Sequence, residues 1–130
     1  LIKRRENFNH LEAGLKNVSG ITVLKQPVDN RFCSSHYCLG MMLNHGKANK
    51  RPAIMEALGK KGVGTSVYYP QPVPRMNYYQ LKYGYEEKKY TNAAEISDSI
   101  IALPVGPHLE LSDIDFIIKS IEEVWSEINV

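Results

Sequence analysis

The stretch that decides the fold is SDIDFIIKSIEEVWSEI, residues 112–128, close to the end of the chain. Apolar side chains recur in it every three or four residues, which is the spacing of an amphipathic helix packed on a core. Ser112 and Asp115 have the spacing of a variant capping box, which marks the start of such a helix. The helix presents one broad apolar face, formed by Ile114, Ile117, Ile118, Ile121, Val124, Trp125 and Ile128.

Upstream of this helix, short strand patterns alternate with helical patterns. The predicted strands cover residues 21–24, 35–43, 65–69 and 100–103. The predicted helices run through Phe8, Leu11 and Leu15 and cover residues 51–61 and 92–99. Residues 71–90 are expected to be irregular, with a short turn of helix within 75–83. This order predicts an α+β fold in which helices cover one face of a small, mostly antiparallel sheet of three to four strands.

Length and composition favour one globular domain over residues 1–130. The chain is 43% hydrophobic and 23% charged, and its net charge of +2 points to no particular partner. It has no apolar run long enough for a membrane span and no signal-peptide pattern at its start, so we expect a cytoplasmic protein without a membrane partner. Because the chain lacks an initial Met and already looks helical at residue 1, we expect it to be part of a longer protein.

Two classes of site are considered and set aside. Cys33, His36, Cys38 and His45 suggest zinc, but their spacing matches no common zinc motif, so reduced structural cysteines are the simpler interpretation and no metal is expected. The glycines and lysines of GKKGVGT, residues 59–65, lack the residue order of a phosphate-binding loop.

An alternative function is a stand-alone nucleic-acid-binding module of similar topology. Residues 61–68 partly match the aromatic strand signature of an RNA-binding domain. However, Val63 and Thr65 occupy the positions that would carry base-stacking rings. The residues alone name no reaction, because no nucleophile–base set and no carboxylate pair stands out.

The most unusual segment is GVGTSVYYPQPVPRMNYY, residues 62–79, in which tyrosines flank a proline-rich turn. It belongs to one of four blocks that follow one another along the chain. The blocks are Arg5, Asn7 and Leu11 with VSGI (18–21), then SSHYCLGMML (34–43), RPAIMEALGKKGVGTSVYYPQPV (51–73) and SDSIIALPVGPHLELSDIDFIIKSIEEVW (97–125). In order and spacing they resemble the C-terminal small domain of the DegT/StrS family of pyridoxal-phosphate-dependent sugar aminotransferases, over nearly the whole chain.

The resemblance implies a parent enzyme that moves an amino group from glutamate to a keto-sugar nucleotide, in amino-sugar or polysaccharide biosynthesis. In such enzymes a large domain supplies the lysine that carries pyridoxal phosphate, and the complete protein is a homodimer. The partners implied are the chain's own large domain, the nucleotide sugar and glutamate, and not nucleic acid. This chain alone is expected to hold no cofactor and to be inactive.

The resemblance also implies that the tyrosine- and proline-rich turn faces the cleft between the domains. We expect Tyr68, Tyr69, Arg75 and His36 to face this cleft. Tyr68 is expected to orient a polar group rather than transfer a proton, because the ordinary pKa of tyrosine is near 10. Arg75 suits a phosphate or carboxylate but is equally compatible with a solvated turn. For Tyr78 and Tyr79, substrate contact and domain packing remain open.

Two residues depart from the family pattern. Pro74 and Gly106 stand where relatives often carry histidine. The roles of individual side chains therefore do not transfer directly from the family to this chain.

Overall fold

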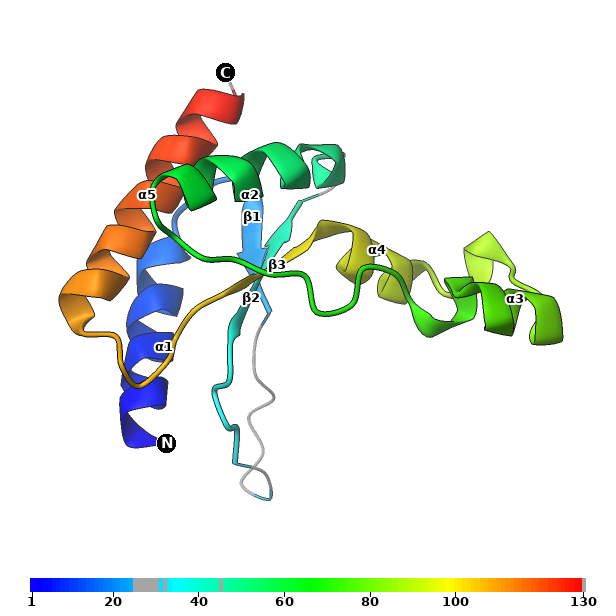
Figure 1. Ribbon diagram of the computed structural model, residues 1–130, viewed down its shortest axis with the longest axis horizontal. Helices are drawn as coiled ribbons and strands as arrows, with labels where there is room; N and C mark the ends of the chain where they lie inside the picture. The colour runs from blue at the N-terminus through cyan, green and yellow to red at the C-terminus, as the bar shows by residue number, and fades with distance from the viewer. Residues whose placement is uncertain (25–30, 32, 45, 130) are drawn as a thin grey trace.

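A small sheet forms the centre of the computed structural model, with helices on one side and an arm that extends away on the other (Figure 1). The structure describes residues 1–24, 31, 33–44 and 46–129. The strands are β1 (Ile21–Val23), β2 (Leu39–Leu43) and β3 (Ile100–Leu103). The helices are α1 (Ile2–Leu15), α2 (Arg51–Lys60), α3 (Asn77–Tyr83), α4 (Thr91–Ser99) and α5 (Leu111–Asn129), with short 3₁₀ turns at Ala48–Lys50, Val73–Arg75 and Glu87–Lys89.

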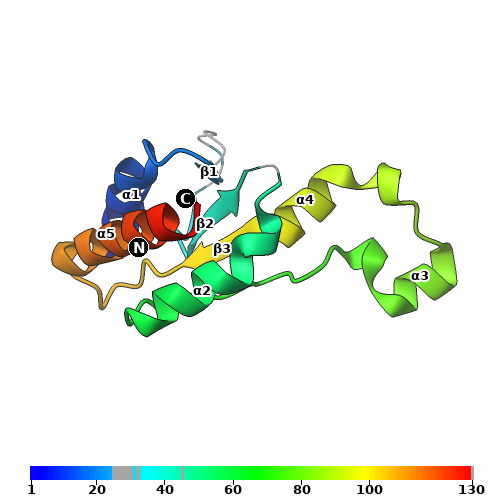
Figure 2. The same ribbon diagram turned by 90° about the horizontal axis from the view of Figure 1, so that it is seen from above.

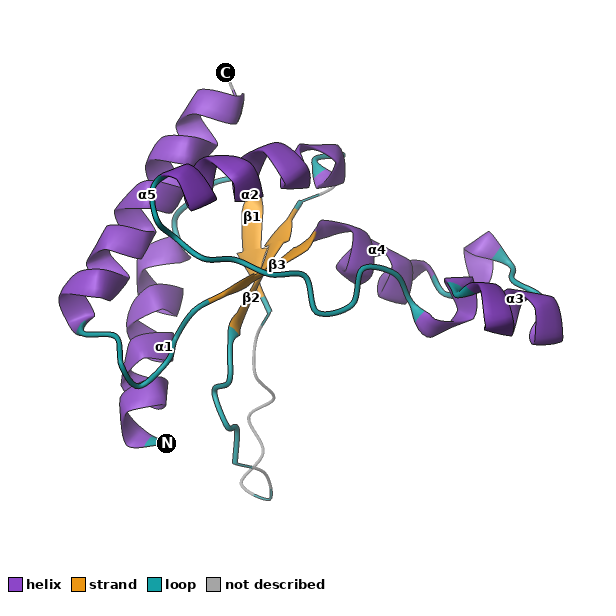
Figure 3. Ribbon diagram, in the orientation of Figure 1, coloured by secondary structure: helices purple, strands orange, loops and turns teal. Residues whose placement is uncertain are grey.

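The three strands lie in the order β1-β2-β3, and both neighbouring pairs are antiparallel. Ile21 pairs with Leu43, and Leu39 pairs with Leu103. The predicted α+β fold with a small antiparallel sheet is therefore confirmed. Figure 3 shows how few residues the sheet contains compared with the helices around it.

The two faces of the sheet differ in burial. Along β2, Leu39, Met41 and Leu43 are buried, whereas Gly40 and Met42 on the other face are only partly covered. The buried side chains join one core with residues of α1, α2 and α5, which lie on the same side of the sheet (Figure 2). In the part of the chain that the structure describes, no helix has the length and apolar character needed to cross a membrane.

Two predicted strands are shorter than expected. The strand predicted at 35–43 begins only at Leu39, and His36 has a left-handed backbone conformation with φ of 47°, which interrupts an extended chain. The strand predicted at 65–69 is wrong apart from one bridge between Ser66 and Ala102 of β3. Pro70 and Pro72 follow closely and lack the N–H groups that would extend the pairing.

The start of α5 also differs from the prediction. The side chain that caps it is Asp113, whose Oδ2 accepts a hydrogen bond of 2.8 Å from the backbone N–H of Glu110. Oδ1 of Asp115 instead lies 2.6 Å from Nε2 of His10, and this contact links α5 to α1. The capping box predicted at Ser112 and Asp115 is therefore replaced by a contact between helices.

The arm comprises residues 70–99 and carries α3 and α4 away from the core (Figures 1 and 2). No residue of α3 is buried, and its Leu81 is 89% exposed. A seven-residue helix without a buried face gains little stability from its own hydrogen bonds. This part of the chain therefore offers apolar and aromatic surface that the core does not use.

Candidate functional site

Three neighbouring hollows meet at the tyrosine- and proline-rich turn. The largest, the sheet groove, has a volume of about 610 Å³ and lies over the partly covered face of the sheet. Its floor includes Leu24, Gly40 and Ile100, and α4 contributes Ala93 and Ile96 to its wall. The turn supplies the opposite wall, from Tyr68 to Pro74. The prolines fix the path of this wall because each of them restricts φ.

Tyr68 stands at the junction of two hollows, because its ring lines the sheet groove and also a smaller hollow beside α1. Its ring centroid lies 5.8 Å from that of Tyr37. Loss of water around the hydroxyl, and then its hydrogen bond with Tyr37, raise the pKa of Tyr68 above the ordinary value. The hydroxyl therefore stays protonated at neutral pH, which suits a group that orients a ligand rather than a base.

Tyr69 lines the same groove and is 72% exposed. Most of its ring is thus free to contact another molecule or domain. The structure brings Tyr68 and Tyr69 together at the sheet groove, and their predicted position at a cleft between domains stays a prediction.

Arg75 lies apart from the three hollows and has a partner within the chain. Its guanidinium donates two hydrogen bonds to the carboxylate of Asp98, at 2.7 and 3.2 Å. Asp98 and the nearby hydroxyl of Tyr85 raise the pKa of Arg75 further above its ordinary value. This paired contact joins the 3₁₀ turn Val73–Arg75 to α4 at the base of the arm, so an outside anion would have to displace Asp98.

His36 also lies outside the hollows. Its ring packs edge-on against Phe8, with 5.0 Å between the ring centroids, and its backbone N–H donates to Oγ of Ser34 at 3.1 Å. This arrangement fixes His36 against α1 rather than over the sheet groove.

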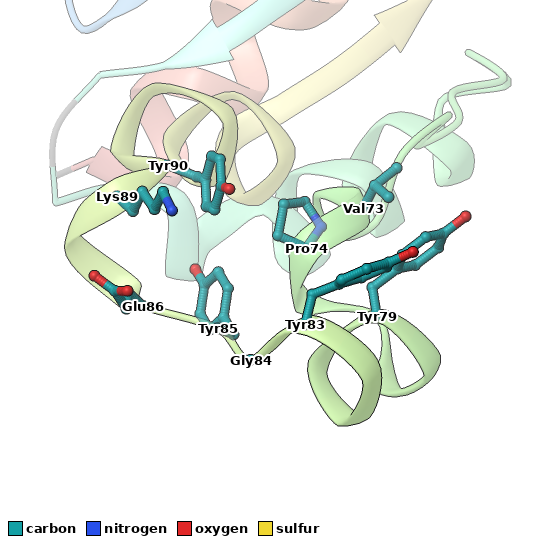
Figure 4. A pocket seen from close by; sticks show the side chains of 9 residues that line it. All are labelled: Val73, Pro74, Tyr79, Tyr83, Gly84, Tyr85, Glu86, Lys89 and Tyr90. Atoms are coloured by element: carbon teal, nitrogen blue, oxygen red, sulfur yellow. The ribbon is translucent and has the colours of Figure 1, made fainter.

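The second hollow, the tyrosine pocket, lies in the arm and has a volume of about 380 Å³ (Figure 4). Tyr79 and Tyr83 stack there with 6.3 Å between ring centroids and an angle of 19° between ring planes. Figure 4 shows Tyr85 and Tyr90 across Pro74 from this pair. Sequence reasoning noticed Tyr79 but missed Tyr83, although the four-residue spacing on a short helix was a usable signal.

In the part of the chain that the structure describes, the sheet groove is lined by uncharged side chains. None of these described side chains can neutralise a phosphate or pair with a pyridine nitrogen. The described residues likewise contain no cluster of three or more His, Cys, Asp or Glu that could hold a metal ion, and His45 lies outside them. Cys33 and Cys38 are free thiols, and burial raises the pKa of Cys38.

Comparisons with known proteins point to one family. The family model described as the DegT/DnrJ/EryC1/StrS aminotransferase family matches residues 1–122. The spore coat polysaccharide biosynthesis protein SpsC of Bacillus subtilis (strain 168) is 24% identical to this chain over 123 residues, which are 94% of this chain and 31% of SpsC. The chain thus spans about a third of the length of this relative.

Solved structures share the fold. PseC of Helicobacter pylori, an aminotransferase involved in the biosynthesis of pseudoaminic acid, superposes with a TM-score of 0.81 and 21% identity, covering 97% of this chain and 33% of PseC. The PLP-form of the putative sugar aminotransferase Spr1654 from Streptococcus pneumoniae superposes with a TM-score of 0.82 and 22% identity, covering 98% of this chain and 31% of that protein.

Proposed function

Because the chain belongs to the DegT/DnrJ/EryC1/StrS aminotransferase family, we propose that it is the C-terminal small domain of a sugar aminotransferase that uses pyridoxal phosphate. The observation that carries this proposal is the family match over residues 1–122. In the complete enzyme, glutamate supplies the amino group and a keto-sugar nucleotide accepts it, as part of amino-sugar or polysaccharide biosynthesis in the cytoplasm.

In this proposal the cofactor belongs to a large domain that precedes the chain. The uncharged lining of the sheet groove supports this, because a cofactor with a phosphate group needs cationic or backbone N–H partners. Bound pyridoxal phosphate stabilises the electrons released when the amino group is transferred. This chain supplies apolar and phenolic surface that closes over the substrate and excludes water.

The sheet groove and the arm are the surfaces that we assign to the rest of the enzyme. Apolar Leu24 and Ile100 and the exposed rings of Tyr69 and Tyr78 would meet the large domain or the second subunit of a homodimer. Covering them would also give α3 the buried face that it lacks here.

We do not extend the proposal to nucleic acid. In an RNA-binding sheet the residues at the positions of Val63 and Thr65 would present rings to a base. Val63 is instead buried in the core. The half-match at residues 61–68 is explained by the end of α2 and the turn that follows it.

A trapping experiment tests the division between the two domains. Pyridoxal phosphate and borohydride are added to the chain alone and to the complete enzyme, and modified lysines are identified by peptide mass spectrometry. We expect one stoichiometrically modified lysine in the complete enzyme and none within residues 1–130 in either sample. A one-to-one adduct on any lysine of this chain would show that the domain assignment is wrong.

The role of Tyr68 is tested in the complete enzyme by Tyr68→Phe. If the hydroxyl orients the substrate, its removal should lower kcat/KM. The loss should correspond to about 0.5–1.5 kcal/mol of transition-state stabilisation, the net contribution of one ordinary hydrogen bond. The melting temperature of the chain should stay the same, because Tyr68 is 48% exposed and its ring is kept. Unchanged kinetics together with a lower melting temperature would make Tyr68 a packing residue.

A further inference from the structure

The third hollow, the Arg4 pocket, has a volume of about 250 Å³ and lies between the first turn of α1 and the loop after β3. The residues that line it include Arg4, Tyr37, Ser66, Tyr68 and His108. No Asp or Glu is among the described residues that line this pocket. Its chemistry is therefore cationic and hydrogen-bonding, in contrast to the apolar sheet groove.

Arg4 is half-buried and has no acidic partner among the residues that the structure describes. Its guanidinium lies 5.6 Å from the ring centroid of Tyr37, and no carboxylate of a described residue lies within ion-pair distance of it. Lys3 on the same helix differs from Arg4 in this respect, because its Nζ lies 2.9 Å from Oε2 of Glu110. A guanidinium carries five N–H donors, and contact with the face of a ring does not provide hydrogen-bond acceptors for them.

The walls of the pocket are held in place by contacts outside it. The buried side chain of Asn7 donates hydrogen bonds to the carbonyl oxygens of Gly106 and Leu109, at 2.9 and 3.1 Å. These bonds fix the loop to α1 one turn away from Arg4. The ring of His108 lies over Gly106, where an added Cβ would clash with Cε1 of His108. The arrangement is thus formed before any ligand arrives.

We propose that the Arg4 pocket binds one oxyanion, a phosphate or a carboxylate group. The guanidinium of Arg4 donates to the anion through its planar fork, which matches both groups. Ser66 and Tyr68, which both carry a hydroxyl group, line the same pocket. The volume is smaller than that of pockets that enclose whole drug-sized ligands, so it suits a single charged group at the end of a larger molecule.

The site does not depend on the cofactor, so the chain itself can be tested. Inorganic phosphate and glutarate are titrated separately into the chain at constant ionic strength set with NaCl, and the ring of His108 and the amide of Ser66 are followed by NMR. We expect saturable shifts with at least one probe. Saturation by phosphate alone assigns the site to a phosphate-bearing ligand, and saturation by glutarate alone assigns it to a carboxylate.

Arg4→Gln and Arg5→Gln form a matched pair, because Arg5 is the exposed neighbour of Arg4 and lies outside the pocket. Arg4→Gln should weaken binding about tenfold or more, the loss expected for a hydrogen bond to a charged group, whereas Arg5→Gln should bind like the unmodified chain. Arg4→Lys keeps the positive charge but loses the planar guanidinium. Its affinity should lie between those of Arg4→Gln and Arg5→Gln. Binding that is equally tight in Arg4→Gln, or no saturable shift with either probe, would overturn the proposal.

Discussion

Leu11→Ala is expected to lower the free energy of unfolding of this chain by about 2–5 kcal/mol, the range for removing a large aliphatic side chain from a core. Leu11 is completely buried and belongs to the cluster in which α1 meets α5. The substitution removes apolar contacts and leaves a cavity that the two helices and the sheet cannot fill without moving.

Leu81→Ala is the matched control, since it makes the same chemical change in α3 at a side chain that is 89% exposed. Its effect should stay within about 0.5 kcal/mol. Urea unfolding followed by circular dichroism measures both variants, with equal m-values as the check that the two unfold alike. Similar losses in the two variants would mean that the arm is as firmly packed as the core, contrary to the structure.

Most of the fold could be predicted because strong local signals mark its elements. The seven residues of the apolar face within 112–128 specify α5, and Pro52 marks the first turn of α2. Pro104 ends β3 where the strand pattern predicted, at Leu103. Each of these signals lies within one helix or strand, so it can be recognised in the sequence without knowing which elements pack beside it.

The strands predicted at 35–43 and 65–69 differ from the structure because their extent depends on more than local sequence. The β-branched residues Thr65 and Val67 favour extended backbone, but whether a strand forms depends on a partner with free N–H and C=O groups. Only Ser66 finds such a partner, at Ala102 of β3. The left-handed conformation of His36 is likewise uncommon for a residue other than glycine, and no sequence pattern predicted it.

The candidate site was predictable only in part, because its walls come from distant segments. Tyr68 and Tyr69 stand out in the sequence as neighbours of a proline-rich turn, and the structure places both at the sheet groove. Arg4 is one charged residue among several on a helix surface, and its isolation from carboxylates appears only when α1 packs beside Tyr37. The pairing of Arg75 with Asp98 depends in the same way on how the arm folds back.

Gly20→Ala is the second substitution with a large expected effect. Gly20 has a φ of +86°, so a residue with a side chain would lower the free energy of unfolding by about 1–2 kcal/mol through the left-handed conformation alone. An added Cβ would also lie 2.6 Å from Cζ2 of Trp125, whose indole N–H donates to the carbonyl oxygen of Ser19 at 2.6 Å. Overpacking of this kind costs about 1–3 kcal/mol more, because the ring of Trp125 must move away from the turn.

Gly62→Ala separates these two costs, because Gly62 has the same φ of +86° and an added Cβ there would meet nothing within 4 Å. It should lose only the conformational part, about 1–2 kcal/mol. Urea unfolding monitored by tryptophan fluorescence measures both variants, and the single Trp125 also reports any movement of its ring. Gly20→Ala should therefore unfold at lower urea than Gly62→Ala and show altered fluorescence in its folded state. Equal midpoints and unchanged fluorescence would mean that Trp125 does not pack against the turn between α1 and β1.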